Sequence, residues 1–254
     1  MDSIIQTTEF RFTQNKQFDL NSETLELPIS EHLEEFRQRL LQCLGFAVIT
    51  IGVLFFRITP IVEFLEAPVQ EIKFIQLSPG EYFLSTVKIA FYGGLLLSIP
   101  FLISQLIFYI LPGLTKDEKR IILPTLLTSL LLFSLGLGFA YKILIPAALN
   151  FFIGYSETVI EPLWSFDQYF DFILFLFYST GLSFQVPIIQ VIVGLAGIVS
   201  GKQMLGAWRY IILAATIISA ILTPSTDPVT QICLSLAILF LYFTGATFLV
   251  LYKK

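Results

Sequence analysis

The sequence predicts an all-α polytopic membrane protein with six transmembrane helices. Its 254 residues are 56% hydrophobic and only 13% charged, whereas soluble domains carry about 25% charged residues. A core of this length cannot bury so much apolar surface, so a bilayer must act as the solvent. Six long stretches also contain no lysine, arginine, aspartate or glutamate, which sets the number of spans.

Each charge-free stretch contains 17 to 30 residues, and a helix needs roughly 17–25 apolar residues to cross the hydrocarbon. The first and fifth are the shortest, so we expect local thinning of the bilayer or tilt of neighbouring helices there. A single membrane domain is predicted over 29–254, with spans at about 40–56, 89–111, 121–141, 172–199, 210–224 and 229–252.

Residues 1–28 are predicted to form a polar, disordered tail. They contain five acidic residues against only Arg11 and Lys16. A secretory signal has a basic start and an early apolar run, and an organelle transit peptide is poor in acids. The tail is therefore not expected to be a targeting segment.

The basic residues orient the helices. With six spans, the two termini share one side with the loops between spans two and three and between spans four and five, and these segments hold 11 of the 15 lysines and arginines. The positive-inside rule then places both termini on the cytoplasmic or stromal side. The outer side has an acidic, aromatic segment at 150–171 and a proline-containing loop at 58–87, long enough for short helices that cap the outer face.

The segment before the first span is predicted to be an interfacial helix. Leu33, Phe36 and Leu40 lie on a single apolar stripe. Glu35 and Arg39 are spaced i, i+4, which favours a surface ion pair. On spacing alone, that structural role is favoured over a binding role for Glu35.

No catalytic residue, cofactor or metal site is predicted. His32 is the only histidine, lies outside every span and has no cluster of other ligands near it. Cys43 and Cys233 fall inside predicted spans, where small apolar packing residues are expected. An intramembrane enzyme would need a nucleophile with a base, or metal ligands, within the membrane.

The loop between spans two and three contains a helix-capping pattern. Thr115 and Glu118 have the spacing of a capping box ahead of an apolar run. Glu118 thus has a complete structural explanation, against which any binding role must be weighed.

Few polar residues occur inside the spans. Pro100 in span two and Pro187 in span four each remove a backbone hydrogen bond and are expected to kink their helices. Gln185 is a primary amide at membrane depth, where it needs a partner. Either an internal helix–helix hydrogen bond or contact with another subunit would satisfy it.

Several motifs in sequence order resemble the TatC family, the signal-receptor subunits of the twin-arginine protein translocase. The resemblance runs from about residue 28 to the end of the chain. Its motifs are HLEEFRQRL at 32–40, SPGE at 78–81, PGLT at 112–115 followed by EKR at 118–120, GLSFQVP at 181–187 and LTPSTD at 222–227.

The resemblance implies a receptor and not an enzyme. Family members bind the twin-arginine signal peptides of folded precursors and recruit single-span TatA- and TatB-like subunits for transport driven by the proton gradient. Signal-peptide binding would fall on Glu35 and Glu118, with Arg37 and Tyr109 supporting this inner-face site. Gln185, where many members have glutamate, would contact a partner subunit. Self-association is expected, and a nucleic-acid partner is not.

A small-solute secondary transporter is the alternative function. Such proteins usually have inverted repeats with broken helices at matching positions, and the two span prolines are the only hint of that arrangement. The segment TPSTDP at 223–228 resembles the cyanobacterial and plastid branch of the family. We therefore expect a plastid-encoded thylakoid membrane protein, with a cyanobacterial thylakoid or plasma membrane as the alternative.

Overall fold

The computed structural model describes residues 29–69, 74–110, 116–156, 163–223 and 227–252. The predicted tail at 1–28 and Thr115 of the predicted capping box lie outside these ranges. The chain forms two units, Met1–Leu40 and Leu41–Lys254. One helix continues through the boundary between them.

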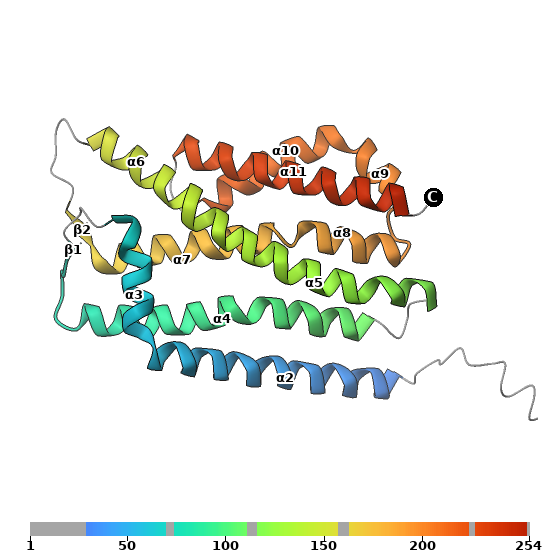
Figure 1. Cartoon of the computed structure of the whole chain (residues 1–254), viewed down its shortest axis with the longest axis horizontal. Coiled ribbons are helices and arrows are strands. Elements are labelled where there is room, and N and C mark those ends of the chain that lie inside the picture. Colours follow the sequence, from blue (N-terminus) through green and yellow to red (C-terminus); the bar gives the residue numbers. More distant parts are fainter. Residues whose placement is uncertain (1–28, 70–73, 111–115, 157–162, 224–226, 253–254) are drawn as a thin grey trace, which may run out of the picture. The chain divides into compact units, whose positions relative to one another are not determined.

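The described residues are mainly helical (Figure 1). The elements are α2 (Ile29–Phe56), α3 (Ile58–Glu66), η1 (Ala67–Val69), β1 (Phe74–Ile75), α4 (Glu81–Ile110), α5 (Lys116–Phe139), the π-helix η3 (Ala140–Leu144), α6 (Ile145–Ser156), β2 (Trp164–Ser165), α7 (Phe166–Ser183), α8 (Val186–Leu195), α9 (Gly201–Gly206), α10 (Trp208–Leu222) and α11 (Pro228–Tyr252).

The structure agrees with six membrane spans. Within the described ranges, 5 segments are long and apolar enough to cross a membrane, namely Leu33–Phe56, Glu81–Tyr109, Pro124–Tyr155, Phe166–Leu195 and Pro228–Leu251. The sixth, Trp208–Leu222, is a shorter apolar helix. It coincides with the fifth predicted span, one of the two shortest charge-free stretches.

Three helices extend past the charged residues that bound the predicted spans. α2 starts at Ile29 and includes its paired acidic and basic residues. α4 starts at Glu81 and not near 89, since Lys88 is paired with α7. The third span continues past Lys142 through the π-helix into α6. These helices are longer than the charge-free stretches, and the predicted membrane edges within them stay predictions.

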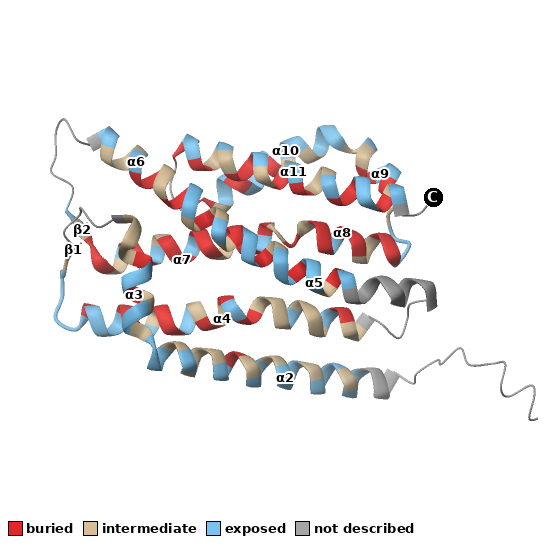
Figure 2. Cartoon of the chain, viewed as in Figure 1, coloured by how far each residue is buried: buried red, intermediate tan, exposed pale blue. Residues whose placement is uncertain are grey.

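The core of the Leu41–Lys254 unit is built around α7 (Figure 2). Phe170, Ile173 and Leu176 on this helix have no exposed surface. They pack in one cluster with side chains from α4 and from the α5–α6 segment. By contrast, Leu44 and Val48 on α2 are 55% and 67% exposed and take no part in this core.

The predicted helical cap on the outer face is present. α3 crosses α4 at a steep angle (Figure 1), and two tyrosines donate hydrogen bonds to carbonyl groups in its last turn. The Tyr141 hydroxyl lies 3.0 Å from Phe64 O, and the Tyr169 hydroxyl lies 2.8 Å from Leu65 O. These bonds satisfy carbonyl groups that a helix end leaves open. The parallel strands β1 and β2 pair nearby.

The two span prolines have different positions in their helices. Pro100 lies inside α4, which continues through it. Pro187 lies in the first turn of α8, where the missing N–H is tolerated. The fourth span is therefore divided, since α7 ends at Ser183 and α8 begins at Val186. The expected kink at Pro187 is a break of the helix just before it.

Candidate functional site

Glu35, one of the two acidic residues predicted to bind signal peptides, forms an ion pair within α2. Arg39 Nη2 lies 2.6 Å from Glu35 Oε1, and Arg39 Nε lies 3.1 Å from the same oxygen. The two side chains are 25% and 27% exposed. The i, i+4 pair predicted from the sequence is confirmed. Both bonds end on Oε1, so this pair does not use the second carboxylate oxygen of Glu35.

Arg37, predicted to support the same site, contacts a different carboxylate. Its Nη2 donates to Glu34 Oε1 one turn earlier on α2. The two side chains are 67% and 49% exposed, so solvent screens this pair strongly. Glu34 and Glu35 are thus neighbouring acids on α2 that differ in exposure and in the arginine each one binds.

The remaining inner-face residues lie in the Leu41–Lys254 unit. Tyr109 is half-buried in the last turn of α4. Glu118 is in the first turn of α5, and its side chain lies outside the described residues. The structure therefore places Glu35 and Arg37 on one helical turn, while the joint site with Glu118 and Tyr109 stays a prediction.

Gln185 forms an internal hydrogen-bonded pair with α5. The Ser129 hydroxyl donates to Gln185 Oε1 over 2.8 Å, and Gln185 Nε2 donates to Ser129 O over 3.2 Å. The glutamine is only 2% exposed. The internal alternative raised by the sequence is thus present in this structure, and the contact with a partner subunit stays a prediction.

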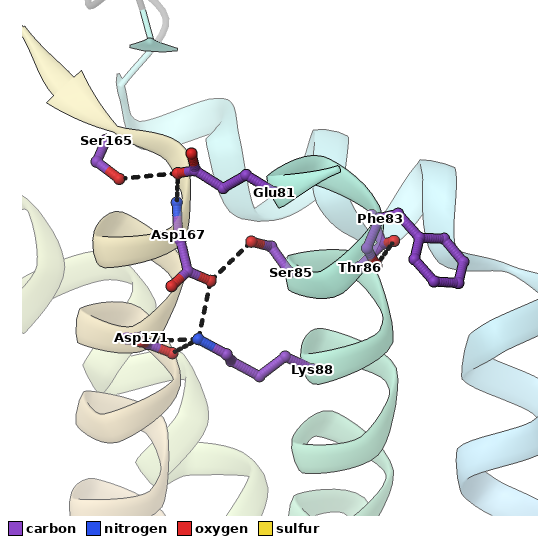
Figure 3. Close-up of polar contacts among 8 residues, drawn as sticks. All are labelled: Glu81, Phe83, Ser85, Thr86, Lys88, Ser165, Asp167 and Asp171. Atoms are coloured by element: carbon purple, nitrogen blue, oxygen red, sulfur yellow. Dashed lines mark hydrogen bonds and ion pairs between the residues drawn. The ribbon is translucent and has the colours of Figure 1, made fainter. Parts of the chain in front are cut away.

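A further polar cluster joins α4 to the start of α7 on the outer side (Figure 3). We call it the outer polar cluster; its members are Glu81, Ser85, Lys88, Ser165, Asp167 and Asp171. Each carboxylate in it has a hydrogen-bond or ion-pair partner from a distant part of the chain.

Glu81 caps two chain segments at once. Its Oε2 accepts hydrogen bonds from the N–H groups of Leu77 (2.6 Å) and Ser78 (3.1 Å). Its Oε1 accepts from the Ser165 hydroxyl (3.0 Å) and from the Asp167 N–H (3.3 Å). Glu81 is 8% exposed. A carboxylate at the N-terminus of α7 is favourable, because it meets unpaired N–H groups and the positive end of the helix dipole.

Lys88 bridges two carboxylates one turn apart on α7. Its Nζ lies 2.8 Å from Asp167 Oδ1 and 2.9 Å from both carboxylate oxygens of Asp171. The Ser85 hydroxyl donates to the same Asp167 oxygen over 2.7 Å. These contacts explain how a lysine can stand within the helix that forms the second span.

Sequence reasoning did not find this cluster. The sequence shows Lys88 beside a span and an acidic segment at 150–171 that contains no base. A search for complementary charges on the predicted outer side could have joined the two. The cluster is structural in character, since its members bind one another. Among the described residues, no group of three or more histidine, cysteine, aspartate or glutamate side chains could hold a metal.

Comparison with known proteins gives consistent matches. The family model for the Sec-independent protein translocase protein (TatC) matches residues 31–236. An uncharacterized tatC-like protein ycf43 from Trieres chinensis is 59% identical over 99% of this chain and 94% of its own length. The chloroplastic Sec-independent protein translocase protein TATC of Arabidopsis thaliana is 50% identical over 87% of this chain and 66% of its own length.

A solved structure has the same fold. The crystal structure of a twin-arginine translocase receptor, TatC, superposes with a TM-score of 0.75 and 33% sequence identity. The match covers 88% of this chain and all of the solved chain.

Proposed function

The chain belongs to the TatC family of Sec-independent protein translocase proteins, and from that membership we propose that it is the subunit that binds twin-arginine signal peptides. Membership makes it a multi-pass membrane component of a protein translocase. The finer proposal concerns which residues recognise the signal and which partners follow.

The proposal rests on the ion pair between Glu35 and Arg39. A guanidinium group of the chain itself, that of Arg39, already contacts Glu35 Oε1 through two nitrogens. The side chain of Glu35 is partly shielded, at 27% exposed, so a charge-assisted bond to it is stronger than one at a fully exposed acid. An arginine of the signal peptide would share or replace Arg39 at this carboxylate.

Glu118 is proposed as the acid that binds the second arginine, with Arg37 and Tyr109 supporting the site. Planar guanidinium groups match carboxylates in a way that lysine cannot reproduce. Two such contacts, at about 1.5–3 kcal/mol each, fall short of the roughly 8 kcal/mol that micromolar binding requires. The apolar part of the signal peptide must therefore contribute through contact with spans and lipid.

After binding, we propose that the chain recruits single-span TatA- and TatB-like subunits, with Gln185 as a contact, and that it self-associates. The transport step would use the proton gradient and would need no catalytic residue or cofactor in this chain. A plastid thylakoid membrane is the proposed location, supported by the likeness to a chloroplastic relative; a cyanobacterial membrane is the alternative.

The test is the affinity of a twin-arginine precursor for the full chain in nanodiscs. Glu35→Gln and Glu118→Gln should each weaken binding by about tenfold, the equivalent of roughly 1.4 kcal/mol. Glu63→Gln is the control, because Glu63 is an exposed acid of α3 outside the proposed site. It should change the affinity little.

Each glutamate variant should then be combined with a precursor in which one signal arginine is replaced by lysine. If acid and arginine touch, the second change costs less once the first is present. If the losses of binding free energy are strictly additive for every acid–arginine pair, these glutamates do not contact the signal arginines.

A further inference from the structure

Arg39 holds the carboxylate of Glu35 at an atom that an arginine of another chain would also need. Its Nη2 and Nε lie 2.6 Å and 3.1 Å from Glu35 Oε1, so two nitrogens of one guanidinium group meet a single oxygen. Glu35 Oε2 takes no part in this pair. The favoured contact between an arginine and a carboxylate has two nitrogens bound to the two oxygens in parallel. An incoming arginine can form that contact only after Arg39 leaves Oε1.

The neighbouring ion pair on α2 does not oppose an incoming arginine to the same degree. Arg37 donates to Glu34 and not to Glu35. Both side chains of that pair are more exposed than those of Glu35 and Arg39. Solvent screens the more exposed pair more strongly, so its two groups separate more easily. Between these two arginines, Arg39 therefore has the firmer hold on an acid of α2.

The same geometry affects arginine and lysine differently. An ammonium group is a point charge without the planar fork of a guanidinium group. A lysine can thus approach Oε2 while Arg39 stays on Oε1. The contact with Arg39 therefore lowers the affinity of Glu35 for an arginine more than its affinity for a lysine.

We propose that Arg39 is an internal competitor for Glu35, and that an arginine of the signal peptide binds Glu35 by displacing Arg39 from Oε1. The contact keeps the carboxylate paired before a precursor arrives, and it weakens the binding of that precursor. This inference rests on the proposed role of Glu35 in binding signal peptides.

The test is the affinity of a twin-arginine precursor for the full-length chain in nanodiscs. Arg39→Gln frees Oε1 and should raise the affinity by about threefold, the size expected for a partly shielded ion pair within a helix. In the Glu35→Gln chain, Arg39→Gln should leave the affinity unchanged, because the carboxylate for which Arg39 competes is gone. If Arg39→Gln fails to accumulate, Arg39→Met removes the same contact with another helix-forming side chain.

Two controls separate displacement from a general change of charge. Arg209→Gln removes an exposed arginine of α10 and should leave the affinity unchanged. In the second control, each signal arginine is replaced by lysine in turn. The gain from Arg39→Gln should nearly disappear for one of the two lysine precursors, the one without the arginine that contacts Glu35.

An affinity that does not rise in Arg39→Gln and Arg39→Met, while Glu35→Gln still weakens binding, would overturn the competitor role and leave the proposed function intact. A gain of the same size in the Glu35→Gln chain, in Arg209→Gln or with both lysine precursors would also overturn the competitor role. An unchanged affinity in Glu35→Gln alone would overturn the proposed role of Glu35 itself.

Discussion

The Thr50 hydroxyl on α2 lies 3.0 Å from the backbone carbonyl oxygen of Gly94 on α4 and 2.8 Å from Ala47 O on its own helix, so it can donate to either carbonyl. The contact depends on the missing side chain, because a Cβ on Gly94 would lie 2.6 Å from Ile51 Cα and 2.7 Å from Ile51 N. In a bilayer, helices associate through such close approach and through polar bonds, since lipid is as apolar as their side chains. Gly94 is thus a fixed contact point between the first two spans.

Gly94→Ala should separate α2 from α4 and lower stability by about 1–3 kcal/mol, the usual cost of overpacking. Gly93→Ala is the control, because a Cβ there would meet only the flexible Leu54 Cδ1, at 3.2 Å. The measurement is the thermal midpoint in detergent together with cysteine cross-linking between α2 and α4. Equal midpoints for the two variants would show that the two helices do not depend on this approach.

Lys88→Gln should destabilise the outer end of the α4–α7 contact, since Asp167 and Asp171 lose the cation between them. Lys142→Gln, at an exposed lysine of the third span, is the comparison and should change stability little. In a double-mutant cycle, Lys88→Gln and Asp167→Asn should couple by about 0.5–3 kcal/mol. A coupling energy near zero would mean that the ion pair between Lys88 and Asp167 contributes nothing to stability.

Gln185→Leu should reduce transport and cross-linking to a single-span partner while precursor binding stays intact. Ser129→Ala separates this role from internal packing, because it removes only the hydroxyl that donates to Gln185. It should lower stability by about 0.6–1.7 kcal/mol, the range for bonds between membrane helices, and leave partner contact unchanged. If Ser129→Ala reproduces the transport defect in full, internal packing accounts for the role of Gln185.

Cysteine probes test the orientation. Positions Lys16, Lys119 and Lys202 should react with a membrane-impermeant reagent from the cytoplasmic or stromal side only, because basic loops stay inside. Glu161 should react from the opposite side only. Labelling of Lys119 and Glu161 from one side would contradict the six-span arrangement.

The sequence predicted the number of spans because each one requires a long charge-free stretch. It also predicted the Glu35–Arg39 pair, whose i, i+4 spacing is a local property of a helix. The ends of the helices could not be predicted from the charges. The second helix continues through Lys88, whose two partners stand on a helix about 80 positions further along the chain.

Long-range partners also limited the prediction of the sites. The need of Gln185 for a hydrogen bond followed from its depth in the membrane, but its partner Ser129 is 56 positions away. Nothing in the sequence around Glu81 indicated that it would cap α7, since the N–H that it binds belongs to Asp167. Such contacts depend on which helices lie side by side, which local patterns do not specify.

The π-helix Ala140–Leu144 changes the direction in which every later residue of the third span faces. One residue in excess of α-helical winding turns everything after it by about 100° around the axis. This rotation determines which side of α6 is buried relative to the buried side of α5. Tyr141, whose hydroxyl donates to Phe64 O, is part of the π-helix. Deleting Lys142 would restore regular winding, and the two halves of the span could then no longer both keep their buried faces. A single-residue deletion here should therefore damage the fold more than any substitution of that lysine.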